Sequence, residues 1–306
     1  MTYADLLDLI RAADAVVVST SAGKDSHLAM ARAARAVREA GSSARLVAVH
    51  ADMGRQEWGS KADAPEGYFA GTPGELAAAQ AAHYGFEFVV ERREQGDLLD
   101  QAAEKGAHPR VGASHCQGTS DHKRGPIYRA YTAVASEWRE AGGSDRRDWR
   151  PCRIVEVTGL AAHESSSRAR RLGKQDTDGL DGRIAYNPKA SGKGTVRQVT
   201  TWNPIADVAD EAAVWDEVWD EVWAGAPAPH WAYGVGMPRL SCAICVHASF
   251  DGLVLAGRHN TGLLEQWVEI ERGFERPWSS RFTLADVLDA VRRGDDISDI
   301  TWADAA

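Results

Sequence analysis

The chain has 306 residues, of which 44% are hydrophobic and 26% are charged, so its composition excludes a disordered or fibrous protein. The longest uninterrupted apolar run, Cys242–Val246, is far shorter than the roughly 18 residues of a membrane-spanning helix. Met1–Arg11 lacks a basic segment followed by an apolar one, which argues against a secretory signal. We therefore expect a cytoplasmic protein without a membrane partner.

Charge is distributed unevenly along the chain. The formal net charge is -9, yet residues 105–200 carry 18 Lys and Arg against 10 Asp and Glu, which leaves 17 basic and 34 acidic residues elsewhere. A basic middle third can receive a polyanion such as ATP or a nucleic-acid strand, or it can be an Arg-rich solvated surface.

Helical and strand patterns alternate over the first 160 residues. The expected helices are 3–13, 27–40, 74–83, 98–103 and 126–140, and the expected strands are 16–18, 46–50, 86–90 and 153–158. The β-branched run Val16–Val18 is typical of a strand that is buried on both faces. Because parallel neighbours need helical crossovers, the alternation predicts an α/β fold with a doubly wound parallel sheet over residues 1–205.

Residues 206–306 are predicted to form a smaller, helical region with a Cys-bearing turn. Ahead of it, residues 183–186 and 196–202 predict a hairpin. In the helix expected at 207–223, one stripe holds Val214, Trp215, Val218, Trp219, Val222 and Trp223. Helical spacing of aromatic residues is ordinary packing, so the stripe favours a core-facing surface over a recognition surface.

The segment Ser21-Ala22-Gly23-Lys24-Asp25-Ser26 lies between a predicted strand and a predicted helix. Small residues let the backbone wrap an anion, and the first amides of a helix point toward it. The G-x-x-x-x-G-K-[ST] spacing of a Walker A loop is absent, so hydrolysis of a terminal phosphate is not inferred. A plain strand-to-helix turn is the alternative, but Ser, Gly, Lys and Asp within six residues favour phosphate binding.

This loop resembles the S-[GA]-G-K-D-S motif of the PP-loop ATP pyrophosphatase superfamily at every position. Three further segments are similar to motifs of its phosphoadenosine-phosphosulfate reductase-like family, which includes DNA phosphorothioation proteins and tRNA thiolases. They are Thr119–Pro126 (T-S-D-x-K-R-G-P), Gly159–Arg168 (G-L-R-x-x-E-S-x-x-R) and Arg239–Cys245 (R-L-S-C-x-x-C). The resemblance runs from about residue 15 to about residue 259 and implies an adenine nucleotide alpha hydrolase-like fold.

The chain departs from the family pattern at three places. Ala161 stands where the pattern has Arg, so one phosphate contact is missing or comes from another residue. Two residues separate Cys116 from Thr119, where the pattern puts Cys directly before Thr. The E-C-G-x-H tail of true sulfonucleotide reductases is absent.

The resemblance implies an ATP site with Mg²⁺ and assigns residues to it. The predicted catalytic residues are Lys24, Asp25, Lys123 and Arg168. The predicted ATP-binding residues are Ser19, Ser21, Ala22, Gly23, Lys24, Asp25, Ser26, Asp52, Gly54, Gly159 and Glu164. Asp25 either orients Lys24 or reaches Mg²⁺, and Glu164 can instead hold Arg168 by a salt bridge.

Cysteine spacing indicates a metal site. Cys242 and Cys245 are two residues apart and can place both sulfurs on one metal, with Cys116 as the predicted third ligand. Cys152 is either a fourth ligand or a packing cysteine. Three thiolate ligands that leave one coordination position open suit a [4Fe-4S] cluster that binds an extra sulfide. Four thiolate ligands suit an electron-transfer cluster or structural zinc. The resemblance favours iron and sulfur.

These observations predict an ATP pyrophosphatase and sulfurtransferase. ATP would adenylate an acceptor oxygen and sulfur would then replace it, with nucleic acid (DNA or tRNA) as the expected acceptor. A sulfur-donor protein such as a cysteine desulfurase is an expected partner, and an oligomer is possible. Two alternatives remain: a sulfonucleotide reductase, against which the lack of any Cys after Cys245 counts, and a non-catalytic nucleotide-sensing subunit with structural zinc.

Overall fold

The computed structural model describes residues 2–112, 115–144, 149–173, 183–192 and 196–298. The chain forms two compact units that are interleaved in the sequence. The first unit contains residues 1–51, 74–91 and 126–228, and the second contains residues 52–73, 92–125 and 229–306. This division differs from the predicted boundary between residues 205 and 206, because two connections after strands of the first unit contribute to the second.

The first unit is built on a six-stranded sheet with the order β3-β2-β1-β6-β8-β7. Its strands are β1 (Ala15–Thr20), β2 (Arg45–Asp52), β3 (Glu87–Arg92), β6 (Cys152–Thr158), β7 (Arg183–Tyr186) and β8 (Arg197–Asn203). Strand β1 pairs in parallel with β2 and β6, and β6 pairs in parallel with β8. The predicted hairpin is confirmed, since β7 pairs antiparallel with β8 at the edge of the sheet.

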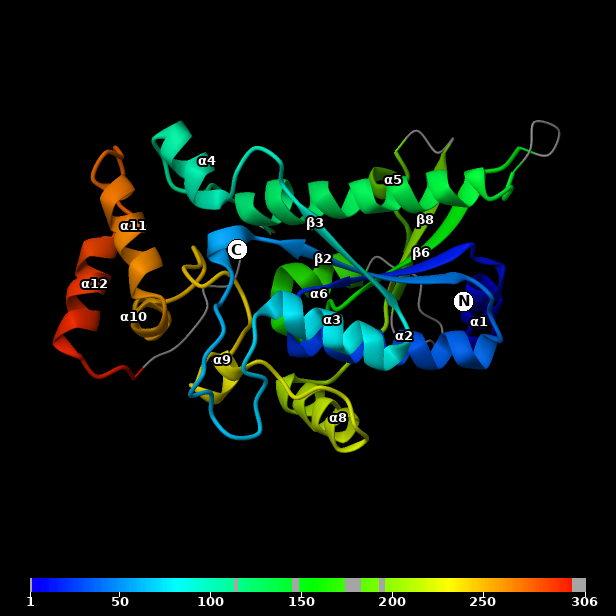
Figure 1. The fold of residues 1–306 in the computed structure, drawn as a ribbon, viewed down its shortest axis with the longest axis horizontal. Helices are drawn as coiled ribbons and strands as arrows, with labels where there is room; N and C mark the ends of the chain where they lie inside the picture. The colour runs from blue at the N-terminus through cyan, green and yellow to red at the C-terminus, as the bar shows by residue number, and fades with distance from the viewer. Residues whose placement is uncertain (1, 113–114, 145–148, 174–182, 193–195, 299–306) are drawn as a thin grey trace. The chain divides into compact units, whose positions relative to one another are not determined.

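Helices cover both faces of this sheet (Figure 1). They are α1 (Tyr3–Ala12), α2 (Lys24–Ala40), α3 (Pro73–Tyr84), α5 (Gly125–Glu140), α6 (Ser166–Leu172), α7 (Pro188–Ser191) and α8 (Glu211–Trp223). Alternate residues of β1 enter different cores: Val16 and Val18 pack with α1, α2 and α8, whereas Ala15 and Val17 pack with α5. The predicted α/β class, with a mostly parallel sheet between two helical layers, is confirmed.

The order of the strands reverses between β1 and β6. From β1 the chain continues to β2 and β3 on one side, and it later returns to place β6 and β8 on the other. The carboxyl ends of β1 and β6 are adjacent, with Ser19 opposite Thr158 in the register. Open α/β sheets bind ligands at such a reversal, beyond the carboxyl ends of the strands.

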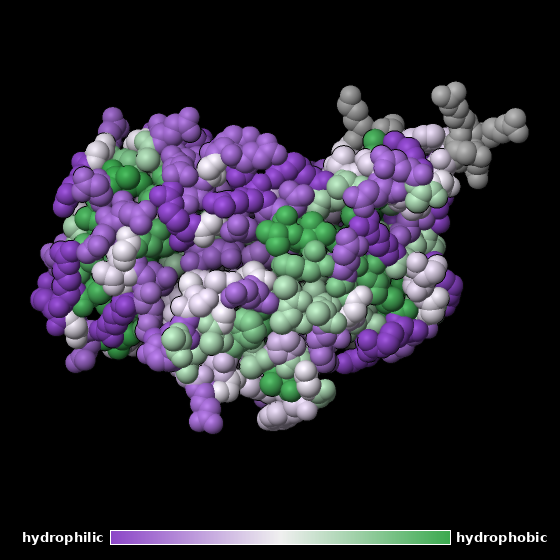
Figure 2. Space-filling view, viewed as in Figure 1, coloured by the Kyte–Doolittle hydropathy of each residue, from purple (hydrophilic) through white to green (hydrophobic). Residues whose placement is uncertain are grey.

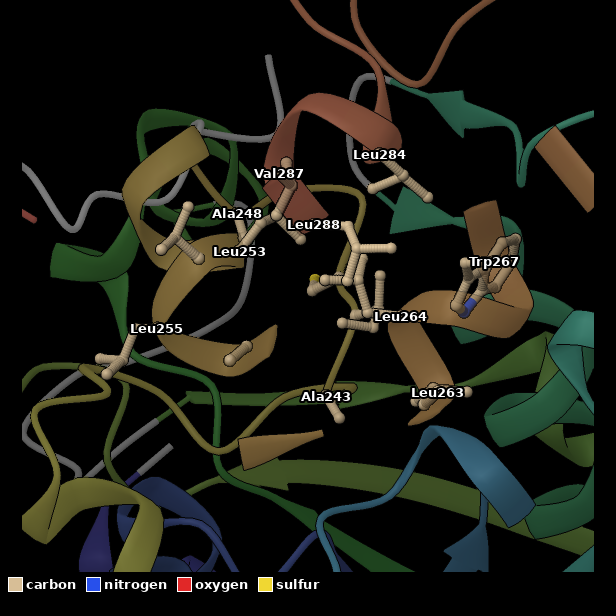
Figure 3. Packing of buried hydrophobic residues seen from close by; sticks show 14 of the residues in the cluster. Ala243, Ala248, Leu253, Leu255, Leu263, Leu264, Trp267, Leu284, Val287 and Leu288 are labelled. Atoms are coloured by element: carbon tan, nitrogen blue, oxygen red, sulfur yellow. The ribbon is translucent and has the colours of Figure 1, made fainter. Parts of the chain in front are cut away.

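The second unit is mainly helical. It contains α4 (Leu98–Lys105), β4 (Val111–Gly112), β5 (His115–Cys116), a π-helical segment (Gly118–Arg124), α9 (Trp231–Gly234), α10 (Phe250–His259), α11 (Thr261–Glu271) and α12 (Leu284–Arg293). Its apolar core joins α10, α11 and α12, and Figure 3 shows Leu264 of α11 and Leu288 of α12 meeting within it. Helix α12 begins with a capping box formed by Thr283 and Asp286.

The stripe of α8 that was predicted to face the core does so in part. Val214 and Val218 are fully buried and Trp215 packs against the same core, whereas Trp219 is partly exposed and Trp223 is 78% exposed. Successive helical residues are 100° apart, so the tryptophans lie beside the buried valines rather than on the same line. Within the described parts of the chain, no helix has the length and apolarity needed to cross a bilayer.

Candidate functional site: a buried lysine at the reversal of the sheet

The predicted phosphate loop connects β1 to α2 at the reversal of the sheet. Helix α2 begins at Lys24, three residues earlier than predicted, and its first internal hydrogen bond runs from the His27 amide to the Gly23 carbonyl at 2.9 Å. Lys24, Asp25 and Ser26 therefore form the first turn, where helix amides favour an anion. Asp25 there also suits the positive end of the helix dipole.

Ala22 has a left-handed backbone, with φ of 61°. This conformation costs a non-glycine residue about 1 kcal/mol or more, and such strain is often found at ligand sites. A hydrogen bond of 3.1 Å from the Ala22 amide to the Thr20 hydroxyl helps to hold it. The loop is therefore tightly shaped before any ligand binds.

Ser26 stabilises the loop itself. Its hydroxyl donates to the Gly23 carbonyl at 2.9 Å and accepts from the Ser21 amide at 3.3 Å. The Ser21 hydroxyl lies 3.5 Å from the same oxygen. Ser19, just before the loop, pairs with the buried Tyr131 hydroxyl at 3.2 Å. The serines that were predicted to bind phosphate thus also fix the shape of the loop.

Lys24 is the central charge of this site. Its side chain is only 3% exposed, and its Nζ atom lies 3.2 Å from Asp25 Oδ2 and 3.6 Å from Glu211 Oε1. Burying an ammonium group is costly unless counter-charges lie beside it, and the carboxylates of Asp25 and Glu211 supply such counter-charges. The other oxygen of Asp25, Oδ1, is buried and has no hydrogen-bond partner among the described residues.

Gly159 follows β6 and packs directly against this loop. A Cβ atom at this position would lie 2.6 Å from the carbonyl carbon and oxygen of Asp25 and 2.8 Å from the Ser26 amide nitrogen. Any side chain would therefore displace the first turn of α2. The structure thus brings Gly159 against Asp25 and Ser26, two residues that the sequence analysis assigned to the same ATP site.

Glu164 and Arg168 form an ion pair, which is the structural alternative considered for Glu164. Glu164 also accepts a hydrogen bond of 3.3 Å from the Ala161 amide, and its side chain is 7% exposed. Ala161, in place of the Arg of the family pattern, is fully buried. Arg168 is one third exposed and lies on α6 beside the exposed Arg170 and Arg171.

Asp52 and Gly54 belong to the second unit, where they form a tight turn. Asp52 Oδ1 accepts a hydrogen bond of 2.7 Å from the Gly54 amide. Gly54 has φ of 61°, and a Cβ there would lie 2.8 Å from the Arg92 guanidinium. Both residues therefore have a local structural role that the sequence analysis did not anticipate.

The three predicted metal ligands also belong to the second unit. Cys116 lies in β5, with its sulfur 3.5 Å from the Thr119 hydroxyl, and His247 forms a hydrogen bond with it. Burial raises the pKa of the Cys116 thiol, but the bonds with His247 and Thr119 outweigh it and lower the pKa to about 7. Cys116 therefore has the character of a reactive thiol.

Cys242 and Cys245 lie in the turn that precedes α10. Burial raises the pKa of Cys242 to about 12, and the nearby thiolates of Cys245 and Cys116 also raise it, whereas Lys123 lowers it. Cys242 is thus close enough to Cys116 and Cys245 to interact with them electrostatically, and Lys123 is close enough to lower its pKa.

The metal itself remains a prediction. Across the described ranges, no group of three or more His, Cys, Asp or Glu side chains is arranged to hold a metal ion. Metal binding deprotonates thiols, so a bound metal would reverse the raised pKa of Cys242. Cys152 is fully buried in the first unit, and burial, followed by the charge of Asp14, raises its pKa to about 12, as for a packing cysteine.

Two residues of these clusters were missed by the sequence analysis. Glu211 is in the first turn of α8, far in sequence from Lys24, and no local pattern connects them. His247 stands two residues after Cys245, and the resulting C-x-x-C-x-H spacing is a signal that could have found it. No model of a known protein family matches this chain, and no similar protein is found among the curated ones. The family resemblance therefore rests on the motifs alone.

Proposed function

We propose that this chain is an ATP pyrophosphatase with an adenine nucleotide alpha hydrolase-like fold. The observation that carries the proposal is Lys24: a lysine 3% exposed, held by two carboxylates, in the first helical turn after the central strand of a parallel sheet. A buried positive charge at a helix N-terminus and at a sheet reversal is suited to a polyphosphate. The strained Ala22 and the close approach of Gly159 add support.

Each residue of the loop has a role in this proposal. The amides of the first turn and the Lys24 ammonium would bind phosphate oxygens and stabilise the charge that develops on pyrophosphate as it leaves. The buried, unpartnered Asp25 Oδ1 is the oxygen available to Mg²⁺, which is usually held by one or two carboxylates, waters and the phosphates. Arg168, held by Glu164, is a further cation of the same unit.

The reaction follows from this assignment. An acceptor oxygen attacks the α-phosphorus of ATP, the bond to the β-phosphate bridging oxygen breaks, and pyrophosphate leaves. The product is an adenylated acceptor, from which a sulfur nucleophile displaces AMP. The protein contributes positioning and charge stabilisation rather than a covalent intermediate.

The second unit would supply the sulfur. Cys242 interacts electrostatically with Cys116 and with Cys245, and three thiolates are a donor set that suits a [4Fe-4S] cluster or zinc. A cluster, when bound, would present a sulfide to the adenylated acceptor. Zinc would favour the nucleotide-sensing alternative instead.

We further propose a nucleic-acid acceptor, a cytoplasmic setting in which thiols stay reduced, and a sulfur-donor protein such as a cysteine desulfurase. Some basic residues of the middle third are neutralised, since Arg150 and Arg153 pair with Asp14 and Arg129 pairs with Glu91. Arg170 of α6, which is exposed, is the better candidate for a strand-binding surface.

The test combines nucleotide and metal chemistry on protein purified without oxygen. We expect exchange of labelled pyrophosphate into ATP that depends on a nucleic-acid acceptor, together with iron and acid-labile sulfide. In Cys242→Ala we expect loss of the metal but unchanged ATP binding, because the loop belongs to the other unit. Zinc without exchange would support the nucleotide-sensing alternative, and an unchanged metal content in Cys242→Ala would refute the ligand assignment.

A further inference from the structure

The first unit buries a polar network between α5 and the sheet. Although the surface seen in Figure 2 mixes hydrophilic and hydrophobic residues, several polar side chains lie below the surface. One of them is Glu156 of β6, which is only 6% exposed. It accepts hydrogen bonds from the Tyr131 hydroxyl at 2.7 Å and from the Asn187 amide at 2.9 Å, and a third from the Thr201 hydroxyl.

The bonds of Asn187 show that Glu156 acts only as an acceptor. Asn187 Oδ1 accepts a hydrogen bond of 3.1 Å from the Ala190 amide, so Nδ2 is the atom that faces Glu156. Nδ2 also donates to the Thr201 hydroxyl at 3.0 Å, which leaves the single proton of Thr201 for Glu156. Three donors therefore converge on the two oxygens of this carboxyl group.

Tyr131 connects this carboxyl group to Ser19 of β1. Burial, followed by the charge of Glu156, raises the pKa of Tyr131 well above its ordinary value, so the phenol keeps its one proton. It donates that proton to Glu156. The Ser19 hydroxyl lies 3.2 Å from the same Tyr131 oxygen. Because Tyr131 has no second proton to give, Ser19 is the donor in this bond.

Ser19 therefore has only lone pairs left to offer to a ligand. Its side chain is partly exposed at the carboxyl end of β1, beside the reversal of the sheet. Within the described ranges, its hydroxyl forms a hydrogen bond with Tyr131 alone. Ionised phosphate oxygens only accept hydrogen bonds, so they do not suit this hydroxyl. The ribose hydroxyls of a nucleotide can donate, so they do.

The direction of the Ser19 side chain indicates which end of ATP it meets. Val16 and Val18 of β1 pack with α2, whereas Val17 packs with α5, and Ser19 points to the α5 face as well. The phosphate loop leads into α2, on the other face. A nucleotide with its pyrophosphate end at the start of α2 would therefore extend its nucleoside end over β1 toward Ser19.

We propose that Ser19 recognises the ribose of ATP by accepting a hydrogen bond from one of its hydroxyl groups. Tyr131 and Glu156 are positioning residues in this proposal, because they hold the proton of Ser19 away from the ligand. The inference rests on the ATP site proposed above. It adds a preference for ribonucleotides over deoxynucleotides at that site.

Calorimetry on the full chain with Mg²⁺ compares ATP, 2′-deoxy-ATP, 3′-deoxy-ATP and pyrophosphate. One of the two deoxy analogues should bind the wild type about fivefold more weakly than ATP, which is the effect of one neutral hydrogen bond. In Ser19→Ala, the Kd of ATP should rise about fivefold and equal that of the same analogue, with the Kd of pyrophosphate unchanged. Ser42→Ala is the matched control, because this partly exposed hydroxyl donates to the Ile10 carbonyl at 2.9 Å. It should change none of these values.

Tyr131→Phe tests the positioning role. Without the phenol, Ser19 is free to turn its proton toward the ligand, so the preference for ATP over the analogue should fall below about twofold. An unchanged preference in the folded variant would remove Tyr131 from the proposal. Circular dichroism checks the fold, and if this buried substitution prevents folding, Ser19→Ala with the two analogues decides alone.

Two results would overturn the ribose assignment and leave the ATP site intact. One is equal binding of ATP and both deoxy analogues by the wild type. The other is an equal loss of affinity for ATP and pyrophosphate in Ser19→Ala, which would mean that Ser19 donates to phosphate. A wild-type chain that binds neither ATP nor pyrophosphate would refute the ATP site itself, and the ribose assignment with it.

Discussion

Replacement of Glu211 by Gln removes one of the two carboxylates that neutralise Lys24. At 3.6 Å, the Coulomb energy of the pair is about 4–5 kcal/mol at an effective dielectric constant of 20. Glu211 is 51% exposed, however, and Asp25 remains 3.2 Å from the same ammonium. We therefore expect the free energy of unfolding to fall by only about 1 kcal/mol.

The same substitution should strengthen ATP binding. A phosphate that contacts Lys24 from the side opposite Glu211 lies roughly 6 Å from its carboxylate, and at an effective dielectric constant of about 40 this repulsion is about 1.4 kcal/mol. Its removal lowers the Kd of ATP about tenfold. Glu211→Gln thus lowers the free energy of unfolding of the nucleotide-free protein and raises its affinity for ATP. A residue with a merely structural role does not produce this combination.

Urea unfolding and calorimetric titration with ATP and Mg²⁺ measure the two effects. Glu217→Gln is the matched control, since Glu217 is on the same helix and pairs with Arg32, two turns away from the Lys24 contact. We expect this variant to lose similar stability but to keep its Kd for ATP within about twofold. The reasoning fails if Glu211→Gln binds ATP no more tightly than the wild type, or if both variants change affinity equally.

Three further predictions concern other residues. Gly159→Ala places a Cβ 2.6 Å from the Asp25 backbone, so it should weaken ATP binding at least about tenfold in calorimetry, whereas Gly262→Ala, with open space around it, should not. Because Cys116 has a pKa of about 7, its alkylation in metal-free protein should rise through neutral pH. His247→Ala removes the bond that lowers this pKa, so alkylation at pH 7.5 should slow about tenfold, and an unchanged pH profile would contradict the pairing. Arg170→Glu should weaken binding of a single-stranded oligonucleotide and reduce its salt dependence. If the variant binds the oligonucleotide as tightly as the wild type at every salt concentration, α6 is not part of the acceptor surface.

The sequence predicted the central sheet because its signals are local. The β-branched run in β1 and the small residues from Ser21 to Ser26 each determine their own conformation, and the strand, loop and helix follow in order. The true start of α2 at Lys24 was missed, because the residues up to Ser26 were assigned to a loop of small residues. Both residues are good first-turn residues, and Gly23 provides the extended backbone before them.

Contacts between distant segments could not be predicted. The pairing of Lys24 with Glu211 depends on how α8 packs against α2, which is fixed by the bonds of Arg32 and Arg35 to Glu217 and Glu221. The two units are likewise assembled from segments far apart in the sequence. The helical periodicity predicted which residues of α8 lie on one side of the helix, but it did not predict how many of those residues would be buried.

The most direct test of the ATP pyrophosphatase assignment is the identity of the products formed from ATP labelled at the α-phosphate. We predict that the wild-type chain forms AMP and pyrophosphate in equal amounts when an acceptor is present. Asp25→Asn, which we expect to fold as the wild type does, should form neither. Formation of ADP and phosphate, or equal pyrophosphate release by Asp25→Asn, would contradict this assignment.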